Sequence, residues 1–119
     1  MLLRHLALAV QDEQRSREFY ERWFGFGVAP PRRYPDGVLM LYGPGDVALA
    51  LGHTPVRPSL PAFLHFGFTL EDPGAVRDLR DALAREGVEI VEFWDEPGYV
   101  SVKCRDPDGY VVEAAWEPD

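Results

Sequence analysis

The sequence has only one cysteine, Cys104, among its 119 residues, so no disulfide can form within the chain. A free thiol suits a reducing compartment, and we expect a cytoplasmic protein. Long apolar runs are also missing. No stretch approaches the roughly 20 apolar residues that span a bilayer, and Arg4 interrupts the short apolar run at the N-terminus. We therefore expect neither a membrane protein nor an exported one.

Basic residues are in the minority. The 12 lysines and arginines are outnumbered by 20 acidic residues, which gives a formal net charge of −8. A nucleic-acid-binding surface needs a basic patch, so we expect no nucleic-acid partner. The acidic balance is typical of a solvated surface, and it would also attract a cationic ligand. Hydrophobic residues still make up 46% of the chain, enough for the core of a single domain, 1–119.

The first half of the chain has the pattern of a strand, a helix and three further strands. Apolar and small residues alternate over 5–10, as in a strand with one buried face. Asp12 follows as a helix N-cap, and Gly25 is expected to end that helix. The three strands, separated by the turn sequences YPDG and GPGD, are predicted around 26–33, 38–43 and 46–52. Pro30 and Pro31 make the first of them an edge or irregular strand.

The second half repeats this order after a proline-rich linker, 53–61. A strand over 63–72 ends in the N-cap Asp72, and Gly87 ends the helix. Strands follow around 88–94, 99–105 and 110–116. Two βαβββ modules, 1–52 and 62–119, thus make up the chain. The predicted fold is α+β, with curved mixed sheets around a shared cleft and the helices outside.

A histidine begins the first strand of each module. His5 and His65 each lie seven residues before the N-cap aspartate of their own module. The apolar rows beside them are expected to face the helices, which leaves both histidines on the other face with only small residues behind them. Space beside an imidazole is typical of a cleft rather than of a close-packed core. One such histidine would more often be structural, but the repeat favours a functional pair.

The last strand adds a carboxylate. Glu113 alternates with apolar residues, where a charge needs a partner. Aligning Pro44 with Pro107 places Ala50 at the equivalent position of the first module. Two neutral imidazoles and one carboxylate form a facial triad for a divalent metal, with iron(II) or manganese(II) favoured and zinc(II) or nickel(II) as further options. The alternative is a buried His–Glu cluster without metal.

Three segments of the chain resemble the vicinal oxygen chelate superfamily, which includes glyoxalase I, fosfomycin-modifying enzymes, bleomycin-resistance proteins and extradiol dioxygenases. They are HLALAVQDEQRSREFYERWFGFG (5–27), HFGFTLED (65–72) and RDPDGYVVEAAW (105–116). By position, the resemblance implies that His5, His65 and Glu113 are metal ligands. It also implies a small-molecule partner and a homodimer. The acid that glyoxalase I has on the last strand of its first module is absent from VALALG.

The resemblance implies a metal-dependent enzyme, a dioxygenase, lyase or transferase, whose substrate chelates the ion through two adjacent oxygens. Ser101 and Lys103 alternate with apolar residues on the strand beside Glu113, so we expect both to face the cleft as catalytic residues. Lys103 would stabilise an oxyanion or act as a base. Tyr42 is expected to line the ligand cavity, whereas Cys104 falls on the core-facing row.

A second hypothesis is a protein of the bleomycin-resistance type, which sequesters a cationic or aromatic ligand without turnover. The ligand would stack on the aromatic residues around EFWDEPGY, namely Trp94, Tyr99 and Phe93. Its charge would be matched by Glu92, Asp95 and Glu96. A third option is a metal-free protein whose role is association.

Overall fold

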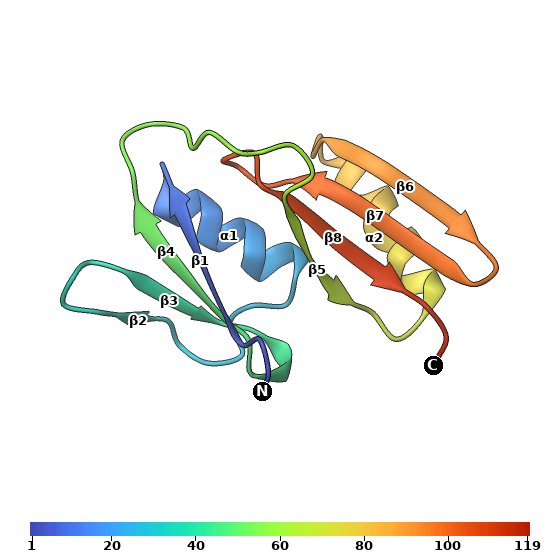
Figure 1. Cartoon of the computed structure of the whole chain (residues 1–119), viewed down its shortest axis with the longest axis horizontal. Coiled ribbons are helices and arrows are strands. Elements are labelled where there is room, and N and C mark those ends of the chain that lie inside the picture. Colours follow the sequence, from blue (N-terminus) through green and yellow to red (C-terminus); the bar gives the residue numbers. More distant parts are fainter. The chain divides into compact units, whose positions relative to one another are not determined.

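The computed structural model describes all residues, 1–119. The chain forms two compact units, 1–59 and 60–119. Each unit contains one α-helix and four strands (Figure 1). The first consists of β1 (His5–Val10), α1 (Glu13–Trp23), β2 (Arg32–Arg33), β3 (Leu39–Tyr42), the 3₁₀ turn η1 (Pro44–Asp46) and β4 (Ala48–His53). The second consists of β5 (His65–Thr69), α2 (Pro73–Arg85), β6 (Ile90–Glu96), β7 (Tyr99–Arg105) and β8 (Val111–Trp116).

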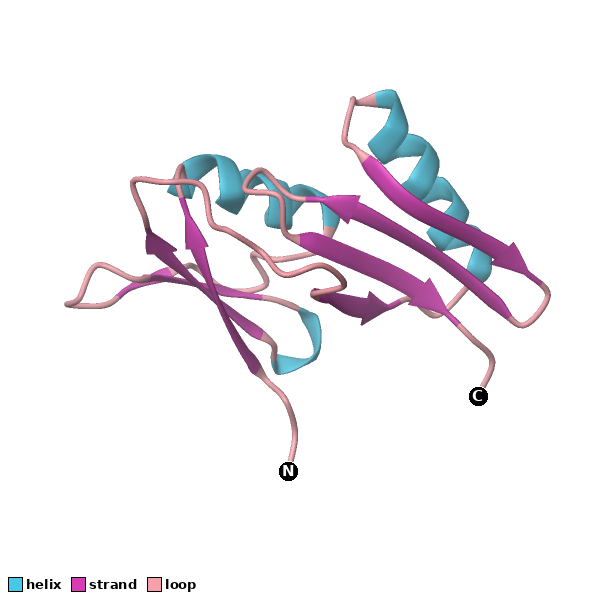
Figure 2. Ribbon diagram, turned by 45° about the horizontal axis from the view of Figure 1, so that its top comes forward, coloured by secondary structure: helices cyan, strands magenta, loops and turns pink.

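The two sheets have the same topology. Their strand orders are β1-β4-β3-β2 and β5-β8-β7-β6. In each sheet the first strand of the unit pairs parallel with the last, and the other pairs are antiparallel. Each sheet has four strands, and Figure 2 shows it in ribbon form with the helix of its unit. The predicted α+β fold of two tandem βαβββ modules with mixed sheets is therefore confirmed.

The strand predicted over 26–33 is much shorter in the structure. Only Arg32–Arg33 pair with β3, because the two prolines before them have no N–H to donate to a ladder. The backbone N–H groups of Gly27 and Val28 instead donate to the carbonyl oxygen of Tyr42, at 2.8 and 3.2 Å. At the other end of the unit, β4 extends to His53, one residue into the predicted linker.

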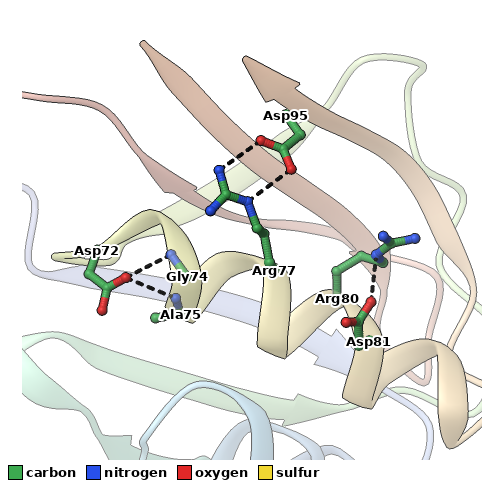
Figure 3. A network of polar contacts seen from close by, with 7 residues as sticks. All are labelled: Asp72, Gly74, Ala75, Arg77, Arg80, Asp81 and Asp95. Atoms are coloured by element: carbon green, nitrogen blue, oxygen red, sulfur yellow. Dashed lines mark hydrogen bonds and ion pairs between the residues drawn. The ribbon is translucent and has the colours of Figure 1, made fainter. Parts of the chain in front are cut away.

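Both helices begin and end where their caps predict. The Asp12 carboxylate accepts a hydrogen bond from the Arg15 backbone N–H at 3.1 Å. The Asp72 carboxylate accepts from the backbone N–H groups of Gly74 and Ala75, at 2.7 and 3.3 Å (Figure 3). Beyond each helix a glycine takes a left-handed conformation, with φ 74° at Gly25 and 79° at Gly87, as a C-terminal cap needs. Neither helix is long and apolar enough to cross a membrane.

Each sheet buries one face against the helix of its own unit. In the second unit α2 packs on β6, β7 and β8. The residues buried there are Val76, Leu83, Val100, Val102, Cys104, Val112 and Ala114. Burial raises the pKa of the Cys104 thiol to about 12, so this cysteine is a core residue rather than a nucleophile, as its row predicts.

Candidate functional site

The side of the second sheet that is turned away from α2, here called the distal face, collects most of the predicted site residues. Strand pairing sets Glu113 opposite Gly67 on β5 and opposite Lys103 on β7. Lys103 in turn lies opposite Glu92 on β6. Residues directly opposite each other share a sheet face, so the four positions form one row across the sheet. One row along, Ser101 lies opposite Trp94.

Only one of the two carboxylate oxygens of Glu113 is contacted by neighbouring polar side chains. The Ser101 hydroxyl donates to Glu113 Oε2 at 3.1 Å, and Lys103 Nζ lies 3.8 Å from the same oxygen. Glu113 Oε1 makes no hydrogen bond in the structure. The Lys103 side chain is only 15% exposed because β7 is an interior strand, so it is not the solvated lysine of a sheet edge. The carboxylate therefore keeps one oxygen available for a further ligand.

Lys103 also forms an ion pair with Glu92 on the neighbouring strand. Glu92 Oε1 accepts hydrogen bonds from Trp94 Nε1 at 2.6 Å and from Lys103 Nζ at 3.2 Å. The Trp94 bond, and then the Lys103 bond, lower the pKa of the Glu92 carboxyl, so it is ionised at neutral pH. Since an ammonium group donates hydrogen bonds and accepts none, Lys103 suits the stabilisation of an oxyanion better than the role of a base.

The pairing of Glu92 with Lys103 is the feature of this site that the sequence pattern did not reveal. The signal for it is the hairpin that joins β6 and β7, in which Glu96 pairs with Tyr99 across a two-residue turn. Counting back from such a turn pairs Glu92 with Lys103 directly, because the register of a hairpin follows from its loop length.

The imidazole of His65 is oriented by the backbone. Its Nδ1 lies 2.8 Å from the carbonyl oxygen of Phe63. A carbonyl only accepts hydrogen bonds, so Nδ1 is the donor, and in the neutral ring this leaves the lone pair on Nε2. This is the arrangement that metal-binding histidines use. Gly67, two residues on, allows β5 to approach closely, since an added Cβ would lie 3.1 Å from the Cβ of Glu113.

The first unit repeats this arrangement without the acid. His5 pairs with Ala48 and Ala7 with Ala50, in the same register as His65 with Val111 and Gly67 with Glu113. Ala50 is therefore the positional equivalent of Glu113. Tyr42 also pairs with Ala48, so it shares the sheet face of His5. Lost hydration, and then a hydrogen bond with Tyr34, raise the pKa of the Tyr42 hydroxyl.

The predicted triad takes His5 from the first unit and His65 and Glu113 from the second. Within either unit, no three His, Cys, Asp or Glu side chains lie close enough together to hold a metal. The donor chemistry of the second unit nevertheless fits a divalent ion. It combines a free imidazole Nε2 with a free carboxylate oxygen, which are two of the three ligands of a facial triad.

Of the aromatic and acidic residues on β6, only alternate ones reach the distal face. Trp94 lies there and is 48% exposed, and Tyr99 on β7 shares that face. Phe93 and Asp95 were expected beside the ligand, and this expectation is wrong. The Arg80 guanidinium lies 4.3 Å from the Phe93 ring centroid, and Arg77 on α2 donates to both Asp95 oxygens at 2.9 Å (Figure 3). Both side chains therefore contact α2 rather than the distal face.

Two tandem βαβββ modules, each with a histidine at the start of its first strand, define the class of protein to which this chain belongs. A family model of the Glyoxalase/Bleomycin resistance protein/Dioxygenase superfamily matches residues 2–114, and the chain is a member of this superfamily. An uncharacterized protein of Pseudomonas aeruginosa is 32% identical to it, in an alignment that covers 96% of this chain and 87% of that protein.

Solved structures of the superfamily have the same fold. The fosfomycin resistance protein FosX from Listeria monocytogenes is similar with a TM-score of 0.78 at 15% identity, covering 97% of this chain and 92% of that one. The lactoylglutathione lyase from Agrobacterium tumefaciens is similar with a TM-score of 0.72 at 21% identity, covering 96% of this chain and 92% of that one. At these identities the similarity concerns the fold, and the reaction of this chain is a separate question.

Proposed function

We propose that the protein is a metal-dependent enzyme that acts on a small molecule with two adjacent oxygens, with His5, His65 and Glu113 as the metal ligands. The observation that carries this proposal is the pair of free donor atoms on the second unit, His65 Nε2 and Glu113 Oε1. Iron(II) or manganese(II) is the proposed ion, because the donor set combines imidazole nitrogen with carboxylate oxygen. We also propose that the protein is cytoplasmic and dimeric.

A bound ion would supply Lewis-acid chemistry, or a centre for O2 activation, to a substrate that chelates it. The chain's own residues would do the rest. Ser101 fixes one oxygen of Glu113, which leaves the other oriented for the metal. Lys103 donates toward negative charge that develops on the substrate, and Glu92 keeps its ammonium in place. The reaction class, whether dioxygenase, lyase or transferase, depends on the substrate.

Metal analysis tests this proposal. Protein purified without chelator is expected to contain a divalent metal, and His5→Ala, His65→Ala and Glu113→Gln are expected to lower its content at least tenfold. His53→Ala is the matched control, since His53 is the remaining histidine and ends β4 outside the triad. If the wild type and all four variants contained equally little metal after anaerobic iron(II) reconstitution, the proposal would be wrong.

The alternative, sequestration of a cationic ligand, has less support. Of its three acids, Glu92 is bound by Lys103 and Trp94, and Asp95 is bound by Arg77. The exposed Trp94 still favours an aromatic ligand. A binding assay on the metal-stripped protein with a cationic glycopeptide separates the two functions: we expect no binding, and micromolar binding would favour sequestration.

A further inference from the structure

A pocket of about 380 Å³ lies within the second unit, beside the row that contains Lys103. The segment over 60–64 forms one wall of it, and His65, Lys103 and Val111 contribute from the sheet. The volume lies within the range of small-molecule sites, which are mostly apolar with a few fixed polar groups.

The charged side chains that line the pocket are already paired. Lys103 Nζ lies 3.2 Å from Glu92 Oε1, and both residues line the pocket. Arg105 Nε lies 2.9 Å from Glu89 Oε2, and Arg105 also donates to the Gly109 carbonyl at 3.1 Å. The charges of Lys103 and Arg105 are therefore each balanced by a carboxylate already. A ligand with a full charge would lose hydration and compete with these partners, whereas an uncharged group would not.

Phe63 carries strain at the mouth of this pocket. Its φ is 72°, a left-handed conformation that bulky side chains rarely adopt, and its side chain is 88% exposed. The ring lies edge-on to the imidazole of His65, with 5.1 Å between ring centroids, and Lys103 Nζ lies 5.9 Å from its centroid. Backbone strain of this kind persists mainly at functional sites, and an exposed aromatic ring there offers a stacking surface.

We propose that this pocket binds an uncharged aromatic part of the ligand, and that Phe63 is the residue that selects it. The inference deepens the proposed function, since it describes the substrate beyond its metal-chelating oxygens. Lys103 has three donors and one hydrogen-bonded partner, so an N–H remains for a carbonyl or hydroxyl oxygen on the ring.

The test uses three probes of one size, namely benzamide, benzoate and benzylammonium, on metal-free full-length protein. Backbone amide shifts in two-dimensional NMR are expected to move at Leu64, Gly109 and Val111 with benzamide, with a Kd at least fivefold lower than for either charged probe. Phe63→Ala should weaken benzamide at least fivefold. Ala62→Trp should abolish binding by filling the pocket, since Ala62 is exposed and can accept a larger side chain.

Val28→Ala is the control, because Val28 is an exposed apolar residue of the other unit. The proposal is overturned if benzamide leaves the pocket amides unmoved, if all three probes bind alike, or if Phe63→Ala and Val28→Ala behave the same. Benzamide has no pair of adjacent oxygens, so its binding does not depend on metal. A negative result with benzamide would therefore not contradict the proposed metal site. A negative metal analysis would not contradict the proposed aromatic pocket.

Discussion

Gly67 has no side chain, and this lets β5 lie close to the strand that carries Glu113. An added Cβ would lie 3.1 Å from the Glu113 Cβ and 3.2 Å from the Glu113 carbonyl oxygen. Neither atom can move without shifting β8 itself. In the first unit the equivalent pair is Ala7 and Ala50, so both positions there carry a Cβ. The contact at Gly67 involves only the Cβ and the carbonyl group of Glu113, so it reflects the spacing of β5 and β8 and not the length of the acidic side chain.

Gly67→Ala is therefore expected to lower the free energy of unfolding by about 1 kcal/mol, because overpacking outweighs the entropic gain of replacing glycine. It should also lower the metal content by displacing Glu113. Urea unfolding and metal analysis measure the two effects. Thr69→Ala, on the same face of β5 and exposed, is the control. If Gly67→Ala were as stable as the wild type, β8 would be able to shift away from the added Cβ without a cost in free energy.

Trp94 acts on Glu92 as well as offering an exposed ring. Because the folded-state pKa of Glu92 lies below its ordinary value of 4.5, its ionisation stabilises the fold above that pH. That contribution is lost as the pH falls through the lowered pKa. The Trp94 hydrogen bond is the largest cause of the shift.

Trp94→Phe is expected to raise the pKa of Glu92 toward 4.5, as measured by NMR titration of its carboxyl carbon. The stability difference between this variant and the wild type should narrow as the solution is acidified below that value. Trp23→Phe, at the end of α1, is the control and should leave Glu92 unchanged. An unaltered titration in Trp94→Phe would mean that Lys103 alone sets this pKa.

Among the secondary-structure elements, α2 is fixed at its start and along its length. Asp72 caps its first turn, and Arg77 bonds both carboxylate oxygens of Asp95 on β6. The arginine also lowers the pKa of the Asp95 carboxyl. This ion pair is partly exposed, and exposed pairs contribute little, so the cap is the stronger attachment. The helix in turn supports the sheet that carries the site.

Asp72→Ala is expected to destabilise the protein by about 1 kcal/mol, because two backbone N–H groups lose their acceptor. Asp72→Asn should retain most of the stability, since the asparagine oxygen accepts the same bonds. Thermal unfolding followed by circular dichroism measures both. Equal loss in the two variants would assign the effect to charge rather than to hydrogen bonding.

The chain contains two copies of one module, but only the second copy has an acidic residue, Glu113, at the proposed ligand position. The registers of the two sheets match, yet Ala50 stands where the second unit has Glu113. One set of ligands per chain follows from this asymmetry under the proposed function. Titration with manganese(II) against a chromogenic chelator is expected to saturate at one ion per chain. Two ions per chain would show that the first module binds metal by itself.

Much of the fold was predictable because its signals are local. The N-cap aspartates, the glycines beyond the helices and the repeat of the strand order all lie within short stretches, and the structure confirms them. The first strand after α1 was predicted as an edge or irregular strand because of Pro30 and Pro31, and β2 does lie at the edge of its sheet. Its predicted length was too great, since only Arg32–Arg33 pair. Phe93 and Asp95 were assigned to the ligand although strict alternation from Trp94 places them toward the helix.

The duplication, the fold class and the row of small residues beside each histidine follow from local signals, because periodicity and capping act over a few residues. Three contacts at the site appear only in the folded chain: the hydrogen bond of Lys103 with Glu92, that of Ser101 with one oxygen of Glu113, and that of His65 with the carbonyl oxygen of Phe63. These contacts join residues on different strands or across a turn. Their formation depends on strand register and on a left-handed backbone that no local preference of phenylalanine favours.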